Sequence, residues 1–286
     1  MNAGDTAFIL LCAAFVFIMT PGLAFFYGGM VRRKNVGNTM MQCVFIMGVS
    51  VIMWVLVGYA LSFGGNHAGI IGGAKWFGFN GVGMKPGPYA DTIPNLAFAA
   101  FQMMFAMITP ALITGSLVGR MKFKALFLFV AIWSVIVYYP MTHMVWGDGG
   151  FLAAIGSVDF AGGDVVHISS GISALVLAII LGRRRGYEHT TYRIHNIPSV
   201  VLGASLLCRR HAALSLYLSA LPQARKRAAA GAGVHPHGLY HEQTLKRSID
   251  SSLPIVPSPL CTSGRRGDFS LPSLCFFATF RCFCDN

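Results

Sequence analysis

His167 is the residue whose type and position point to chemistry most directly. It lies at the start of the apolar run in the segment 164–182, where an ionisable side chain is costly and therefore indicates a functional site. Histidine has an ordinary pKa near neutrality, which suits a proton acceptor. Small residues share its helical face and would let another helix approach closely. We expect His167 to point into a helix interface, either as that acceptor or as a packed, hydrogen-bonded core residue. The small residues are Gly171, Ala174, Ala178 and Gly182.

Three aromatic residues are candidates for recognising and gating a cation. Trp146 ends an apolar segment beside Gly147 and Asp148, where tryptophan either anchors a helix at the membrane interface or attracts a cation to its ring face. Phe101 and Phe105 are four residues apart, so they stack on one face of a helix. Such a pair either fills a core or forms a dry constriction in a pore.

Two carboxylates, Asp159 and Asp164, precede the apolar run that carries His167. The helix dipole favours negative charge at this position, so we expect both to cap the helix N-terminus.

The remaining motifs are weak. The glycines between residues 64 and 83 lack the Gly-Lys-Ser/Thr ending of a phosphate loop, and the cysteines near the C-terminus lack zinc spacing. Three histidines near the C-terminus are too loosely spaced to predict a metal site: His235, His237 and His241.

The elements that must position these residues are membrane helices. Hydrophobic residues make up 55% of the 286 residues and charged residues only 11%, which excludes an ordinary soluble domain and a disordered chain. Residues 7–31 form an uncharged run of 25 residues, whereas about 20 span a bilayer. No basic region precedes this run, which is also too long for a signal peptide. We predict an all-α polytopic membrane protein with four further spans, at residues 39–63, 95–119, 125–147 and 164–182.

Half of the net charge of +12 lies in residues 1–207 and is explained by topology; residues 208–286 carry the other half. Most basic residues of the first 207 follow the first, third and fifth spans, and by the positive-inside rule those loops are cytoplasmic. The N-terminus is therefore predicted to be extracellular, and the partner is the lipid bilayer, with no nucleic acid. The residues in these loops are Arg32, Arg33, Lys34, Arg120, Lys122, Lys124, Arg183, Arg184, Arg185 and Arg193.

The character of the chain changes after residue 207. A sixth apolar run, residues 196–207, stops at Arg209 and Arg210, and two arginines near mid-span cost about 5–7 kcal/mol on insertion scales. All 14 Met and all 4 Trp lie before this boundary, whereas 5 of the 7 Cys lie after it. We predict a transmembrane domain at 1–207 with an incomplete sixth span. A basic, Cys-rich, irregular or disordered tail follows at 208–286.

Several stretches resemble the ammonium transporters of the Amt/Mep/Rh family. TPGLAFFYGG at 20–29 and VRRKNV at 31–36 are similar to the end of the family's first helix, and HMVWG at 143–147 is similar to the end of its fourth. DFAGG at 159–163 resembles the start of the fifth-helix signature, which continues through His167, Gly171 and Gly182 to Arg184. The resemblance covers residues 1 to about 207.

The resemblance implies a cell-membrane transporter rather than an enzyme, with ammonium or ammonia as cargo and no cofactor. It implies the first half of an eleven-helix fold, whose two inverted halves enclose a pore, and a homotrimer if the fold is completed. The matching positions would have these roles: Trp146 in an outer recruitment site, Phe101 and Phe105 near a phenylalanine gate, Asp159 supporting the site, and His167 as a pore histidine.

Elementary energetics favours the same mechanism. Burying a bare cation in a low-dielectric pore costs on the order of tens of kcal/mol. Deprotonating an amine whose pKa lies two to three units above neutrality costs only about 3–4 kcal/mol. A pore that recognises the cation outside and passes the neutral form therefore needs an internal proton acceptor, for which we assign His167.

The family's second half has no counterpart after Pro198. We hypothesise that residues 208–286 result from a frameshift or altered splicing. Two other functions remain open from the sequence. One is a truncated, non-conducting family member with a structural or regulatory role. The other is a membrane redox subunit that binds haem through His143 and His167.

Overall fold

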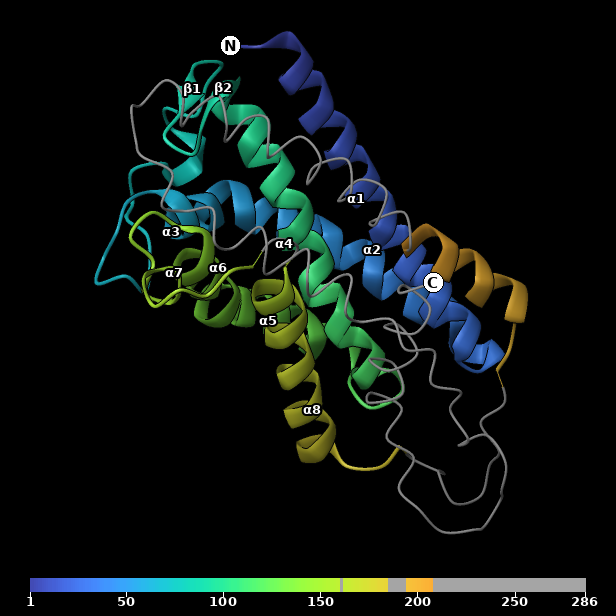
Figure 1. Ribbon diagram of the computed structural model, residues 1–286. Coiled ribbons are helices and arrows are strands. Elements are labelled where there is room, and N and C mark those ends of the chain that lie inside the picture. The colour runs from blue at the N-terminus through green and yellow to red at the C-terminus, as the bar shows by residue number, and fades with distance from the viewer. Residues whose placement is uncertain (160–161, 185–193, 208–286) are drawn as a thin grey trace, which may run out of the picture. The chain divides into compact units, whose positions relative to one another are not determined.

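The computed structural model describes residues 1–159, 162–184 and 194–207, all within the unit Met1–Ala213 (Figure 1). The other residues, including the predicted tail at 208–286 with its histidines and five cysteines, lie outside the described residues, as do Arg185 and Arg193.

Five helical segments in the described residues are long and apolar enough to cross a membrane, which confirms the five predicted spans. Several consist of more than one element. The first is α1 (Ala3–Met30), and the second joins η1 (Arg33–Asn35), α2 (Val36–Met53), η2 (Trp54–Gly58) and α3 (Tyr59–Phe63). The third is α4 (Asn95–Leu117). The fourth joins α5 (Phe123–Trp133), η4 (Ser134–Tyr138), α6 (Tyr139–Trp146) and the short α7 (Phe151–Ala154). The fifth joins η5 (Gly163–Ile168) and α8 (Ser169–Leu181).

The second, fourth and fifth spans each contain a π-helical turn, namely η2, η4 and η5. Their hydrogen bonds join residues five apart, and such turns are rare and often lie at functional sites. Nothing in the hydrophobic pattern indicated them. His167 lies inside η5, so the candidate proton acceptor is on an irregular turn rather than on a regular α-helix.

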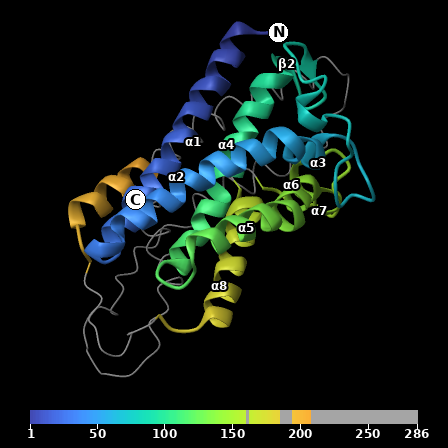
Figure 2. The same cartoon turned by 180° about the vertical axis from the view of Figure 1, so that it is seen from behind.

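Helices α1, α2 and α4 pack against one another (Figure 2). The hydroxyl of Tyr27 on α1 donates to the Leu112 carbonyl of α4 at 2.9 Å. The indole of Trp54, which is fully buried at the start of η2, donates to the Ala99 carbonyl at 3.1 Å. These bonds satisfy polar groups inside an apolar interface, where an unpaired donor would be costly. α4, which carries Phe101 and Phe105, is thereby held on two sides.

The connection between the second and third spans is structured. It contains η3 (Phe77–Phe79) and a small antiparallel pair, β1 (Pro86–Gly87) with β2 (Ala90–Pro94), which the sequence analysis did not predict. The backbone N–H of Asn2 donates to the Thr92 carbonyl at 2.7 Å. Trp76 stacks on Tyr59 with ring centroids 5.2 Å apart. The connection is therefore fixed both to the start of α1 and to α3.

A shorter apolar helix, Ile197–Leu207, occupies the residues predicted for the incomplete sixth span (orange in Figure 1). It packs against α1 through glycines of both helices. A Cβ atom on Gly203 would lie 2.4 Å from the backbone nitrogen of Phe26, and one on Gly29 would lie 2.6 Å from Val200. Because real Cβ atoms do not approach so closely, these positions require glycine.

Replacing Gly203 with valine is expected to lower the free energy of unfolding by about 1–3 kcal/mol, as overpacking of a close contact does. Gly48→Val is the matched control, because Gly48 also lies within a helix and a Cβ there meets no atom within 4 Å. Thermal unfolding of the detergent-solubilised protein measures the difference. Equal losses in the two variants would contradict the proposed packing role of Gly203.

Candidate functional site

The three predicted aromatic residues form a continuous row. Trp146, the last residue of α6, lies edge-on to Phe105 of α4 with ring centroids 5.8 Å apart. Phe105 in turn lies edge-on to Phe101 at 5.2 Å. All three rings are half-buried, and the Trp146 indole N–H donates to the backbone carbonyl of Asp159 at 2.9 Å. The indole is therefore fixed by one contact on α4 and one at the start of the fifth span.

Asp159 caps the beginning of η5, as predicted. Its two carboxylate oxygens accept backbone N–H groups at 2.6–3.0 Å, which are otherwise unpaired at a helix start. A carboxylate engaged in this way orders the chain that leads to His167. The four donors are Gly162, Gly163, Asp164 and Val165.

The capping predicted for Asp164 is wrong. Its carboxylate accepts a hydrogen bond from the Ser157 hydroxyl at 2.8 Å, while its backbone N–H is bound by Asp159. Asp159 reaches all four donors of the first turn, so Asp164 instead links that turn to the chain preceding Asp159. Both carboxylates therefore stabilise the connection between the fourth and fifth spans by hydrogen bonds.

His167 is half-buried on η5, and its backbone N–H donates to the Gly162 carbonyl at 2.9 Å, five residues back. Gly162 has φ +84, and a Cβ there would lie 2.5 Å from Val166, so the turn requires glycine. η5 contacts both α4 and α6. The structure thus places the segment bearing His167 against the two helices that carry the aromatic row.

α8 packs against α4 on one side. At its end, the Arg120 guanidinium donates to the Ala178 carbonyl at 3.2 Å, where a cation also suits the helix dipole. Gly171, Ala174 and Ala178 of the predicted small stripe are half-buried, whereas Gly182 is exposed. The other side of α8 is apolar and exposed within the part of the chain that the structure describes. Its residues are Ile172, Leu175, Val176, Ile179 and Ile180, next to the exposed Ile168 at the end of η5.

His143 is fully buried on α6 and has a structural environment. Its Nδ1 lies 2.9 Å from the Ser62 carbonyl, to which it donates, and its Nε2 lies 3.4 Å from Asn66 Oδ1. Both ring nitrogens therefore face polar partners of the same chain, which disfavours His143 as a haem ligand. Residues 1–159, 162–184 and 194–207 contain no group of three or more His, Cys, Asp or Glu able to hold a metal ion.

Tyr89 is a residue that the sequence analysis missed. Its hydroxyl donates to the Phe63 carbonyl and accepts the backbone N–H of Asp148, both at 3.2 Å. Burial raises the pKa of Tyr89, so the hydroxyl stays protonated at neutral pH and can make both bonds at once. It joins the end of α3 to the turn that follows Trp146. A single tyrosine in a loop gives no sequence signal for such a role.

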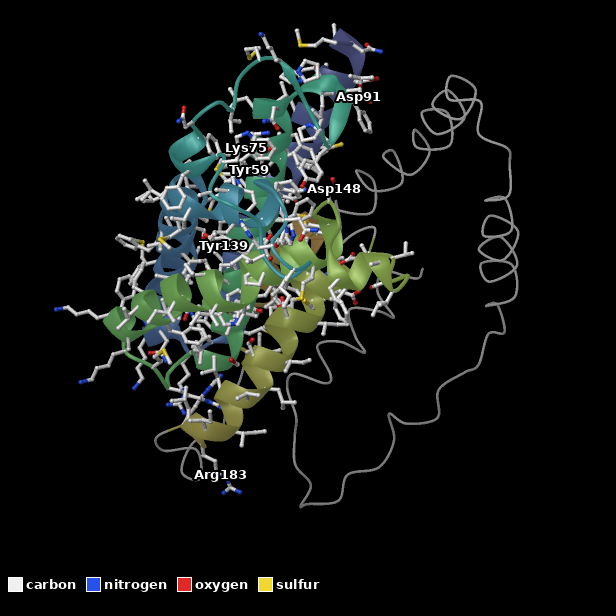
Figure 3. The ribbon with its side chains drawn as sticks, turned by 90° about the vertical axis from the view of Figure 1, so that its left-hand side faces the viewer. Tyr59, Lys75, Asp91, Tyr139, Asp148 and Arg183 are labelled. Atoms are coloured by element: carbon white, nitrogen blue, oxygen red, sulfur yellow. The ribbon has the colours of Figure 1, made fainter. Side chains whose placement is uncertain are left out.

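The charged residues labelled in Figure 3 lie at the two ends of the spans. Basic residues follow α1, α4 and α8, in the loops that begin at Arg32, Arg120 and Arg183. Figure 3 shows Arg183 at one end of the spans and Asp91 at the other, with Lys75 and Asp148 also away from the Arg183 end. Arg183, in a loop rich in basic residues, therefore lies at the opposite end of the spans from Asp91 and Asp148 (Figure 3).

Comparison with known proteins gives a consistent result. The Ammonium Transporter Family model matches residues 7–209. The chain is 49% identical over 207 residues to an ammonium transporter of Bacillus subtilis (strain 168), covering 72% of this chain and 50% of that relative. It is 42% identical over 207 residues to the ammonium transporter Amt1 of Archaeoglobus fulgidus, again covering 72% and 50%.

Among solved structures, Mep2 of Saccharomyces cerevisiae matches with a TM-score of 0.65 and 32% identity, covering 75% of this chain and 50% of that one. The chain therefore spans about half the length of the relatives it matches. The described fold is the first half of that transporter architecture, in a multi-pass membrane protein. Because the family region covers residues 7–209 at these identities, the chain belongs to the ammonium transporter family.

Proposed function

We propose that the chain takes part in ammonium transport across the cell membrane, with Trp146 in cation recruitment and His167 as the internal proton acceptor. The observation that carries the proposal is the row of Trp146, Phe105 and Phe101, which lies on the two helices that η5 contacts. The transported species is inferred from the relatives that are named as ammonium transporters.

The proposed path begins at the indole. Its π face attracts a cation, with a contact worth ~2 kcal/mol or more where water is excluded. Phe105 and Phe101 line the next step with apolar rings, which disfavour a bare ion and favour neutral ammonia. His167 then accepts the proton that the cation gives up, a cheaper route than burying the charge. Asp159 acts indirectly, since its carboxylate binds the start of η5 and its carbonyl holds the indole.

Uptake of labelled methylammonium tests the proposal in cells that lack their own ammonium transporters. We expect saturable uptake above that of empty cells. Trp146→Leu should raise the half-saturation concentration about tenfold or more, because ~2 kcal/mol of recruitment is lost. Trp133→Leu is not a suitable control, since the Trp133 indole bonds to Ser173. Phe77→Leu alters an exposed aromatic residue in a loop and should leave uptake unchanged. Uptake equal to that of empty cells contradicts the proposal.

We also propose that the N-terminus is extracellular and that complete assemblies are homotrimers. An epitope inserted after Asn80, in the exposed loop before α4, should bind antibody on intact cells. An epitope inserted after Met121, between α4 and α5, should bind only after permeabilisation. The reverse pattern would contradict the orientation. Crosslinking of the solubilised protein followed by electrophoresis tests for three subunits.

A second function is favoured by the exposed apolar face of α8. The chain would act as a non-conducting partner that packs this face against a full-length family member. Co-expression of a tagged full-length relative with this chain tests the idea. Co-purification without uptake by the chain alone would favour this function over transport.

A further inference from the structure

Trp146 can recruit a cation only if its indole is held in one place. The turn after α6 contacts two side chains: His143, which is fully buried, and Asn66, which is hydrogen-bonded to the turn. We propose that His143 and Asn66 are positioning residues for Trp146. They act through the turn at residues 147–150, which both of them contact. The proposal deepens the proposed function, on which it rests.

His143 fixes the last turn of α6. It lies three residues before Trp146, is fully buried, and donates from Nδ1 to the Ser62 carbonyl at 2.9 Å. Its own carbonyl accepts the backbone N–H of Gly147 at 2.9 Å. A Cβ on Gly147 would lie 2.4 Å from His143 Nδ1. The chain therefore leaves α6 in direct contact with the imidazole ring.

Asn66 fixes the rest of the turn. Its amide nitrogen donates to the Gly149 carbonyl at 3.0 Å, and its oxygen accepts the Gly69 N–H at 2.7 Å. Because one end of the amide faces an acceptor and the other a donor, its orientation is set. The Phe151 N–H donates to the Gly69 carbonyl at 2.8 Å, which closes the connection.

The turn passes close to the Asn66 amide. Gly149 has φ +71, and a Cβ there would lie 2.2 Å from the Asn66 amide nitrogen. Asp148, between Gly147 and Gly149, donates its backbone N–H to Tyr89, and Figure 3 shows Asp148 on the turn beside α6. The backbone on the C-terminal side of Trp146 is thus hydrogen-bonded by two loop side chains, Asn66 and Tyr89, and by the backbone carbonyl of His143.

The same turn also places the group that holds the indole. The chain runs from residue 147 through α7 to Asp159, whose carbonyl accepts the Trp146 N–H at 2.9 Å. A displaced turn would move the indole and its acceptor relative to each other. Phe105, on α4, would stay in place, so the 5.8 Å edge contact would be lost. Small changes at His143 or Asn66 are therefore expected to appear at the tryptophan.

The test combines fluorine NMR with uptake, using full-length protein labelled with 5-fluorotryptophan. The 4 tryptophans give separate signals, and Trp146→Phe assigns the one of interest. We expect His143→Leu and Asn66→Ala to shift or broaden the Trp146 signal while the Trp133 signal stays unchanged. His143→Asn should preserve the signal, because its amide nitrogen can replace Nδ1 as the donor to Ser62. Asn80→Ala, an exposed asparagine in the same loop, is the matched control.

In uptake, the same two variants should raise the half-saturation concentration about 3- to 10-fold, as loss of one hydrogen bond predicts, with the maximal rate unchanged. A Trp146 signal unmoved in folded variants overturns the proposal. So does an equal shift of all tryptophan signals, or failure of both variants to fold, since either gives the residues a general structural role. A shifted Trp146 signal without any uptake by the parent chain contradicts transport alone and leaves the positioning role standing.

Discussion

Replacing His167 with alanine is expected to reduce methylammonium uptake about 100-fold or more, because a positioned proton acceptor contributes about 10²–10⁴ to the rate of a proton-transfer step. The effect should fall on the maximal rate rather than on the half-saturation concentration, since recruitment at Trp146 is unchanged. Initial rates over a range of methylammonium concentrations measure both quantities. This variant should have the largest effect on transport.

The matched control is His195→Ala. His195 is exposed, and the hydrogen bond it makes to Gly29 uses its backbone N–H, which alanine keeps. Uptake by this variant should equal that of the parent chain. His167→Glu offers a second comparison, because a carboxylate can also accept a proton. If His167→Ala transports at the parental rate, His167 is not the proton acceptor and the packed-residue interpretation holds.

Replacing Asp159 with alanine is expected to lower the free energy of unfolding by about 2–4 kcal/mol, since one helix cap is worth about 1 kcal/mol and bonds to a charged acceptor are worth more. The substitution leaves four backbone N–H groups at the start of η5 without their acceptor. Uptake should fall together with stability, because this segment carries His167. Unfolding in denaturant followed by circular dichroism measures the loss.

Asp159→Asn tests the two carboxylate oxygens separately, because it keeps one acceptor oxygen and replaces the other with an amide nitrogen. The remaining amide oxygen can accept the Gly162 and Gly163 N–H groups, whereas the amide nitrogen faces the two donors of Asp164 and Val165. We expect a loss between those of the parent and the alanine variant. Asp91→Ala, an exposed aspartate on β2, is the control and should change stability within about 0.5 kcal/mol. Equal stability of Asp159→Ala and Asp91→Ala would show that the cap contributes nothing.

The five spans could be predicted because a membrane helix leaves a long apolar run, and because the basic residues concentrate in alternate loops. The aromatic row was partly predictable, since the spacing of Phe101 and Phe105 places both on one helical face. The contact between Phe105 and Trp146 depends on where the fold places α4 relative to the end of α6, which no local pattern encodes. The roles assigned to these side chains and to His167 stay predictions until uptake is measured.

Other features could not be read from the sequence for identifiable reasons. The π turns differ from α-helix by one hydrogen-bond register and leave the apolar pattern intact. The pair β1 and β2 is too short for alternation to be visible. His143 was weighed only as a metal ligand, because its partners Ser62 and Asn66 are about eighty residues away in the chain. Asp159 reaches more donors than capping statistics predict, which left Asp164 free to bond Ser157.

The π turn η5 has a further consequence for how the fifth span tolerates insertions and deletions. A turn with bonds five residues apart holds one residue more than an α-helical turn, and one residue corresponds to about 100° of rotation. Deleting one residue within Gly163–Ile168 would restore a regular helix of nearly the same length. Everything in α8 would keep nearly the same depth and angular phase, so the stripe of Gly171 and Ala174 would still face α4. A single-residue deletion inside α8 itself (Ser169–Leu181), where no wide turn absorbs it, would instead rotate every later residue by about 100°.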